Sequence, residues 1–236
     1  MLSHQLKTFL KIISNFRIKK WISIFIFALL LGGSIILTSE VHELISGGDE
    51  LIGRIDRKTL SFLIEKRSPK INVFMIDLTA LGSATVLTVI TIFLCTYFTF
   101  IKKIKPTIHL LLSIIGSGII TWLLKFYFER SRPDTFLRLV EVEGYSYPSG
   151  HSLSSAAAYF TICAMVCKSI QRGGARSILW VLSLGLIFLI GVTRVYLGVH
   201  YFSDVLAGIL IGIAWASLVE QLVLYFEKLY LPQNKG

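Results

Sequence analysis

Six long apolar stretches divide this chain of 236 residues, and they restrict its possible folds more than any other feature. A helix needs about 20 mostly apolar residues to cross the hydrocarbon core of a bilayer, where lipid offers no partner for an unpaired backbone group. We therefore predict an all-α, six-span transmembrane helical bundle that forms a single domain over residues 1–236. The expected spans are Trp21–Ser39, Ile71–Ile101, Thr107–Phe128, His151–Cys167, Ser177–Tyr196 and Tyr201–Phe226.

The basic residues predict which way this bundle faces. With six spans, both termini lie on one side, and that side carries 13 of the 24 Lys and Arg residues but only Glu220 and Glu227 among the acidic ones. Lys and Arg accumulate on the cytoplasmic side of membrane proteins. We therefore expect a multi-pass protein of a bacterial plasma (inner) membrane with both termini in the cytoplasm. This asymmetry accounts for the net charge of +10, and because no soluble basic surface is evident, nucleic acid is not an expected partner.

The first outer loop, residues 40–70, contains a candidate surface helix. Its apolar residues recur at helical spacing among charged ones; they are Leu51, Ile52, Ile55, Leu60, Leu63 and Ile64. This pattern predicts an amphipathic helix that lies at the membrane surface and helps to handle a lipid. An ordinary loop helix with no role in substrate binding explains the same residues equally well.

A basic cluster ends the third predicted span. Lys125 and Arg132 are seven residues apart, which is about two helical turns, so both side chains can face the same way. Pro133 disfavours helical geometry at Arg132 and is expected to end the helix there. A lysine that reaches toward the membrane surface and an arginine in a loop would give the same pattern.

The fourth predicted span starts with the sequence Pro148-Ser149-Gly150-His151. Gly150 lets backbone approach a ligand closely, and the N–H groups at the start of the helix form a site for a phosphate oxyanion. His151 can give a proton to a leaving oxygen. A helix capped by Ser149 beside an exposed histidine is the structural alternative.

The third cluster joins the last two spans. His200 and Asp204 are four residues apart and so share a helical face, where the carboxylate can fix the imidazole tautomer and leave the other ring nitrogen free as a nucleophile. Arg194 can bind a phosphate through two parallel hydrogen bonds. A structural His–Asp pair that caps the last span is the alternative. All three clusters fall on the outer face in the predicted topology, and together they contain the parts of a phosphoryl-transfer site.

In order and spacing, the three clusters resemble the signature of the type 2 phosphatidic acid phosphatase superfamily. That signature is Lys, six residues and Arg-Pro; then Pro-Ser-Gly-His; then Ser-Arg, five residues, His, three residues and Asp. The clusters form a motif core over residues 125–204 of this chain, and Thr193 stands where the family usually has Ser.

The resemblance implies a metal-independent lipid phosphatase that needs no cofactor. His200 would attack phosphorus and form a phosphohistidine, Asp204 would hold it, and His151 would protonate the leaving lipid oxygen and then activate water. The implied phosphate ligands are Lys125, Arg132, Arg194 and the backbone N–H groups of Ser149 and Gly150, with Pro133, Pro148 and Thr193 in supporting positions.

The family also indicates the substrate class. The chain is similar to bacterial phosphatidylglycerophosphate and undecaprenyl pyrophosphate phosphatases, so a lipid phosphate such as these or phosphatidic acid is the expected partner, together with the bilayer. A phosphotransferase that passes the phosphate to another lipid, or a lipid-phosphate carrier without enzymatic activity, is the alternative. A carrier would place its charges near the bilayer midplane rather than at one face. The sequence makes no prediction about the oligomeric state.

Overall fold

The apolar stretches form helices, and every regular element that the structure describes is helical. The computed structural model describes residues 27–47 and 50–230. The elements are an N-terminal helix Phe27–Ile45, α2 (Glu50–Glu65), α3 (Pro69–Ala80), α4 (Ala84–Phe100), α5 (Ile104–Phe128), the short 3-10 helix η1 (Thr135–Leu137), α6 (Gly150–Ser169), α7 (Gly173–Tyr196) and α8 (Phe202–Tyr230). The all-α prediction is confirmed. The beginning of the first expected span, residues 21–26, lies outside the described residues.

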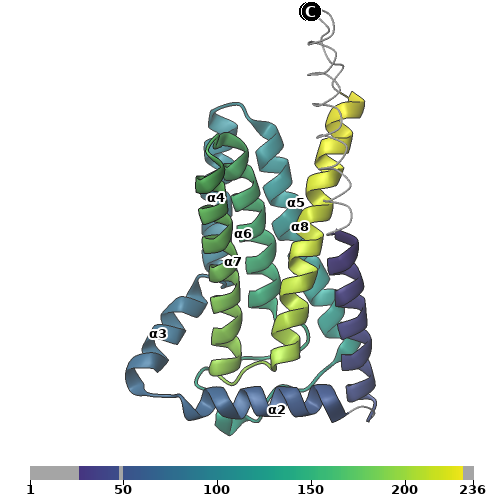
Figure 1. Ribbon diagram of the computed structural model, residues 1–236, viewed down its shortest axis with the longest axis vertical. Helices are drawn as coiled ribbons and strands as arrows, with labels where there is room; N and C mark the ends of the chain where they lie inside the picture. The colour runs from purple at the N-terminus through teal and green to yellow at the C-terminus, as the bar shows by residue number, and fades with distance from the viewer. Residues whose placement is uncertain (1–26, 48–49, 231–236) are drawn as a thin grey trace, which may run out of the picture.

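The long helices run alongside one another, and α2 lies across one end of their bundle (Figure 1). This is the end where α5 and α7 finish and α6 and α8 begin, opposite the C-terminal end of α8. From α2, the shorter helix α3 runs obliquely to the start of α4. The loops that carry the three sequence clusters are therefore gathered at the end that α2 covers.

Four described helices are long and apolar enough to cross a membrane individually, namely the N-terminal helix, α5, α7 and the part of α8 up to Phe226. Helices α3 and α4 meet this condition only as a pair that is bent by 42°. The expected span over Ile71–Ile101 therefore corresponds to this bent pair and not to a single straight helix. The break occurs because Ser83 starts a new helix by accepting a hydrogen bond from the Val86 N–H at 3.2 Å, while the Leu81 carbonyl oxygen accepts one from the Tyr159 hydroxyl at 2.7 Å.

Helix α6 is not apolar enough to count as a candidate span, although the sequence predicted one at His151–Cys167. It is rich in small and hydroxyl-bearing residues, and it packs against α5, α7 and α8. A Cβ atom at Gly208 of α8 would lie 2.8 Å from the Ser149 carbonyl oxygen, and one at Gly212 would lie 2.8 Å from the Ala156 Cβ. Small residues on both helices thus allow their backbones to approach closely, as is common where helices pack in membranes.

Residues 40–70, where the sequence predicted a surface helix, contain α2, which lies across one end of the bundle. One side of it packs on the bundle, where Leu60 lies in a cluster with Val195 of α7 and Val205 of α8. Other apolar side chains point away from the protein, and Leu51 and Phe62 are 52% and 56% exposed. The helix therefore has two apolar surfaces, one buried against the bundle and one open.

Candidate active site

His200 lies in a tight turn between α7 and α8. Gly198 in this turn has a φ of 74°, and a Cβ atom there would collide with the carbonyl group of Leu137. Glycine is the residue that adopts this backbone conformation without strain. The turn is closed by a hydrogen bond of 3.2 Å from the Val199 N–H to the Arg194 carbonyl oxygen. It therefore fixes His200 one helical turn before Asp204.

His200 and Asp204 form a buried pair with exposed fractions of 2% and 0%. The His200 Nδ1 lies 3.5 Å from Asp204 Oδ2. That carboxylate oxygen also accepts hydrogen bonds from the Ser146 hydroxyl at 2.5 Å and from the Tyr201 N–H at 2.9 Å. The carboxylate faces Nδ1, so it favours the proton on this nitrogen and leaves the lone pair on Nε2.

The electrostatics of the site keep His200 neutral. Burial lowers the pKa of the His200 imidazole to about 3; the hydrogen bond and charge of Asp204 oppose this shift, and the charges of Arg194 and Arg132 add to it. At neutral pH the ring therefore carries an unprotonated Nε2. A neutral imidazole beside guanidinium groups can attack an electron-poor centre such as phosphorus.

Two arginines supply positive charge next to this nitrogen. Arg132 Nη1 lies 3.2 Å from His200 Nε2 and also donates to the Val199 carbonyl oxygen at 2.8 Å. Its other nitrogens donate to the carbonyl oxygens of Gly144 and Glu143 at 2.8 and 3.0 Å. These hydrogen bonds hold the guanidinium plane at the site, so it can present a fixed edge to an oxyanion.

Arg194 is buried, with only 4% of its surface exposed. One of its terminal nitrogens donates to the Thr79 hydroxyl at 2.9 Å, but its Nε has no hydrogen-bond partner among the described residues. Buried polar groups in proteins almost always have partners, so this one calls for a ligand. Lys125, in the last turn of α5, donates to the Tyr145 carbonyl oxygen and brings a third cation to the same end of the bundle.

The Pro148–His151 segment forms the start of α6. Ser149 caps this helix by accepting hydrogen bonds from the Ser152 N–H at 3.4 Å and from its hydroxyl at 3.0 Å. The expectation that the Ser149 N–H binds phosphate needs correction, because this group donates to the Asp204 carbonyl oxygen at 3.0 Å. The first-turn N–H groups from Gly150 onward remain as candidate phosphate donors, since a helix start leaves such groups without intrahelical acceptors.

The three residues expected in supporting positions differ in their local structure. The Pro133 carbonyl oxygen accepts hydrogen bonds from the Arg138 guanidinium at 2.9 and 2.6 Å. Pro148 follows a cis peptide bond. The buried Thr193 hydroxyl donates to the Ile190 carbonyl oxygen at 2.6 Å, within its own helix. Thr193 thus contributes to helix α7 and makes no hydrogen bond to the site residues.

Sequence reasoning missed several residues that contact the His–Asp pair. Arg130 donates to Asp204 Oδ1 at 2.5 Å and to Asp56 Oδ2 of α2 at 2.7 Å, and Ser146 bonds Asp204 on its other oxygen. A signal for Asp56 was present in the sequence. It falls four residues after Ile52 and four before Leu60, so it places a carboxylate inside the apolar stripe of the predicted helix.

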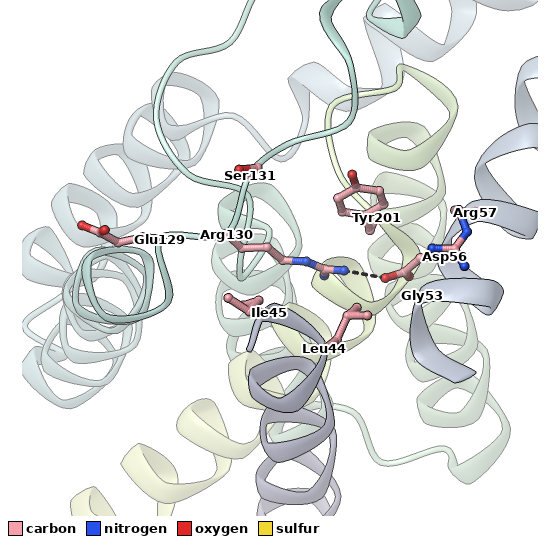
Figure 2. A pocket seen from close by; sticks show the side chains of 9 residues that line it. All are labelled: Leu44, Ile45, Gly53, Asp56, Arg57, Glu129, Arg130, Ser131 and Tyr201. Atoms are coloured by element: carbon pink, nitrogen blue, oxygen red, sulfur yellow. Dashed lines mark hydrogen bonds and ion pairs between the residues drawn. The ribbon is translucent and has the colours of Figure 1, made fainter. Parts of the chain in front are cut away.

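A cavity of 370 Å³ lies beside this ion pair, between the end of the N-terminal helix, α2 and the segment that follows α5 (Figure 2). The guanidinium of Arg130 lies 4.5 Å from the ring centre of Tyr201 and points across the cavity to Asp56. Within the described ranges, no group of three or more His, Cys, Asp and Glu side chains is placed to hold a metal ion.

Known proteins share this combination of fold and motifs. Residues 106–228, more than half of the chain, match the model of the PAP2 superfamily. The chain is similar to phosphatidylglycerophosphatase B of Bacillus subtilis (strain 168), with 30% identity over 203 residues that cover 85% of this chain and 93% of that protein. It is also similar to an undecaprenyl-diphosphatase of Sulfolobus acidocaldarius, with 26% identity over 204 residues that cover 84% of this chain and 88% of that protein.

The fold leads to the same family. The crystal structure of a transmembrane PAP2-type phosphatidylglycerolphosphate phosphatase from Bacillus subtilis superimposes with a TM-score of 0.77 and 26% sequence identity, over 86% of this chain and 98% of that one. The relatives hydrolyse phosphate ester or diphosphate bonds, so the interpretation as a carrier without enzymatic activity is set aside. Because the family match, a relative of nearly the same length and the shared helical architecture agree, we conclude that the chain is a membrane phosphatase that belongs to the PAP2 superfamily.

Proposed function

We propose that this chain is a metal-independent lipid phosphate phosphatase that works through a phosphohistidine at His200. One observation carries the proposal. The buried His200 is neutral, its Nδ1 side faces the Asp204 carboxylate at 3.5 Å, and its Nε2 lies 3.2 Å from the Arg132 guanidinium. An imidazole held in this way has the nucleophilic nitrogen directed at the place where cations would bind a phosphate.

In the first step, a bond forms between His200 Nε2 and phosphorus, and the ester or anhydride bond to the leaving oxygen breaks. His151, in the first turn of α6, gives a proton to that oxygen from its imidazolium form, which the negative charge of the bound phosphate favours. In the second step, His151 takes a proton from water, the water oxygen attacks phosphorus, and the N–P bond breaks. Free phosphate and the original state of both histidines result.

The charge that spreads over the phosphoryl oxygens is neutralised by groups that are fixed before substrate binds. Lys125, Arg132 and Arg194 supply the positive charge, and the Gly150 N–H supplies a backbone donor at the start of a helix. Preorganised cations of this kind stabilise phosphoryl-transfer transition states, where there is little covalent chemistry for other groups to assist. The unpartnered Nε of Arg194 is the strongest single indication of a phosphate oxygen at this position.

We infer that the substrate is phosphatidylglycerophosphate. The match to phosphatidylglycerophosphatase B extends over 93% of that protein, and a solved phosphatase of the same kind shares the fold over 98% of its chain. An undecaprenyl diphosphate is the second candidate, since the archaeal relative also matches over most of its length. Both lipids place a phosphate at the membrane surface and their tails in the bilayer.

The proposed membrane arrangement has six crossings, with α6 as the fourth of them and α3 with α4 as the second. Helix α6 can cross despite its polar sequence because α5, α7 and α8 pack around it. The distribution of Lys and Arg directs both termini into the cytoplasm and the active site to the outer face of the plasma membrane. The open apolar side of α2 would then rest on the membrane surface.

The test is phosphate release by detergent-purified protein, in the presence of EDTA, from phosphatidylglycerophosphate, undecaprenyl diphosphate and phosphatidic acid. We expect turnover that survives EDTA, is fastest with phosphatidylglycerophosphate and is lost in His200→Gln. Turnover that requires added metal, or that persists in His200→Gln, would overturn the mechanism. Consumption of substrate without free phosphate, but with a phosphorylated acceptor lipid, would show a phosphotransferase instead.

A further inference from the structure

We propose that Asp56 of α2, acting through Arg130, positions the catalytic Asp204, so that the helix across the end of the bundle is part of the catalytic machinery. The proposal rests on the proposed role of His200 as nucleophile, because Asp204 acts through that histidine. It assigns two positioning residues: Arg130, which lies inside the first cluster but had no predicted role there, and Asp56, which lies outside all three clusters.

The contacts form one buried network of hydrogen bonds and ion pairs from α2 to the proposed nucleophile. Arg130 donates to Asp56 Oδ2 at 2.7 Å and to Asp204 Oδ1 at 2.5 Å, and the opposite oxygen of Asp204 faces His200 Nδ1. The exposed fractions of Asp56, Arg130 and Asp204 are 1%, 6% and 0%. Little of these three side chains is exposed, so each charge depends mainly on its protein partners.

Asp56 also holds the backbone at the start of α8. Its Oδ1 accepts a hydrogen bond from the Ser203 N–H at 2.8 Å, and its Oδ2 accepts one from the Ser203 hydroxyl at 2.6 Å. The same hydroxyl accepts a hydrogen bond from Arg130 Nη1 at 2.8 Å. Ser203 immediately precedes Asp204, so Asp56 of α2 caps the start of α8, the helix that carries Asp204. The negative charge of Asp56 also interacts favourably with the positive end of the α8 dipole.

The charges in this network explain why Arg130 is needed to keep His200 neutral. Burial disfavours the cation, yet the carboxylates of Asp204 and Asp56 raise the pKa of Arg130 above its usual value, so it stays charged. This charge offsets that of Asp204. Without it, the uncompensated carboxylate would attract a proton onto His200 and convert the nucleophile into an imidazolium ion.

The proposal separates catalysis from packing through a pH profile. Charged or titratable groups surround His200; they are Asp204 of α8, Arg132 of the loop after α5, Arg194 of α7, His151 of α6 and, at the end of α5, Lys125, whose charge acts on Asp204 and His151. Removing Arg130 takes away a positive charge beside Asp204, and this raises the pKa of His200. The acid limb of kcat/KM, which reports protonation of His200 in the free enzyme, is expected to move to higher pH.

The experiment measures phosphate release from water-soluble dihexanoyl phosphatidic acid by Arg130→Met, Asp56→Asn and the double variant. This substrate separates the reaction at phosphorus from any effect of α2 on membrane lipids. We expect kcat of Arg130→Met to fall on the order of 10–100-fold, as for other residues that orient a catalytic ligand, with little change in KM. The acid limb moves upward, and the double variant is no slower than Arg130→Met, because the two residues act in series.

Arg67→Met is the matched control. This arginine follows α2 and joins it to the bundle by donating to the carbonyl oxygens of Tyr196 and Leu137 at distances between 2.6 and 3.0 Å. It makes none of these hydrogen bonds to Asp56, Arg130 or Asp204. We expect its loss to lower thermal stability and to leave the acid limb unchanged. The same pattern in Arg130→Met, or independent and multiplicative effects of the two network substitutions, would overturn the proposal.

Two further variants keep the outcome interpretable. Arg130→Lys retains a positive charge but not the two-sided fork, so it provides a folded protein if the methionine variant unfolds; we expect a reduced kcat with a smaller shift of the acid limb, and an unchanged kcat would contradict the proposal. His200→Gln is measured in parallel. Activity in His200→Gln would refute the proposed nucleophile, whereas an inactive His200→Gln beside a fully active Arg130→Met would refute only the role of Arg130.

Discussion

Replacement of Asp204 by asparagine tests the orientation of His200, the proposed nucleophile, most directly. The carboxylate accepts hydrogen bonds from Arg130 at 2.5 Å, Ser146 at 2.5 Å and the Tyr201 N–H at 2.9 Å, and it faces His200 Nδ1 at 3.5 Å. All of these neighbours offer hydrogen atoms. An amide keeps one acceptor oxygen but turns an NH₂ group toward donors on its other side, so at least one of these contacts becomes repulsive.

The expected loss follows from this geometry. If the amide NH₂ faces His200 Nδ1, the ring shifts its proton to Nε2, which is the nitrogen that attacks phosphorus in the proposed mechanism. The same substitution at the orienting aspartate of a Ser-His-Asp triad lowers kcat about 10⁴-fold, and we expect a loss of about 10³–10⁴-fold here, equivalent to about 4–5.5 kcal/mol in the barrier. Arg130 also loses a charged partner, and breaking a buried ion pair costs about 3–5 kcal/mol in stability.

The assay is kcat at saturating lipid in detergent micelles, normalised to the folded fraction from size-exclusion chromatography. Asp134→Asn is the control, because this carboxylate is exposed at the same end of the bundle and makes no capping hydrogen bond to η1. We expect the control to remain within twofold of the wild type. A folded Asp204→Asn protein that retains more than a tenth of the wild-type kcat would refute the orienting role of this carboxylate.

Three further predictions concern packing, pH and phosphate binding. Gly212→Ala should destabilise the protein by about 1–3 kcal/mol, because its Cβ would lie 2.8 Å from Ala156 of α6, whereas Gly185→Ala, with nothing within 4 Å, should not; thermal unfolding in detergent compares them. The pKa of His200 in the folded protein, about 3, lies below its ordinary value of 6.5, so the unfolded state binds more protons between pH 3 and 6.5. The stability that is present above pH 6.5 is therefore lost as the pH falls toward 3. His200→Gln should lose less stability over this pH window in the same unfolding assay. Arg194→Lys keeps the charge but lacks the fork, so inhibition by inorganic phosphate should weaken at least tenfold, and an unchanged inhibition constant would argue against a contact with phosphate.

The sequence predicted those features that depend on local spacing. His200 and Asp204 lie on one helical face because they are four residues apart, and the start of α6 follows from Ser149 as its cap. The helical class follows in the same way from apolar stretches of about 20 residues. Each of these features is determined by residues within one or two helical turns, and such spacing can be read without knowledge of the tertiary structure.

Features that depend on tertiary contacts were not predictable in this way. The Arg130–Asp56 pair joins residues 74 positions apart, and nothing in the spacing of either segment identifies the other. The N–H of Ser149 was expected to face phosphate, but it is taken by a carbonyl oxygen from α8. The break between α3 and α4 is likewise stabilised from outside, by the Tyr159 hydroxyl of α6. For the Arg130–Asp56 pair and the Ser149 N–H, a partner from a distant segment decides the local outcome; at the break between α3 and α4, it adds to the local cap by Ser83.

The polar character of α6 is best understood as a consequence of the chemistry at its first turn. The proposed mechanism needs unpaired N–H groups and His151 at the start of a helix that enters the membrane, and it needs that helix start to lie against the Asp204 end of α8. Close approach requires small residues along the contact, and Gly208 and Gly212 provide them on α8. A helix with such a surface is too weakly apolar to face lipid, so it must be enclosed, and α5, α7 and α8 enclose it. The position of α6 inside the bundle, and its low hydropathy, thus follow from the placement of the active site.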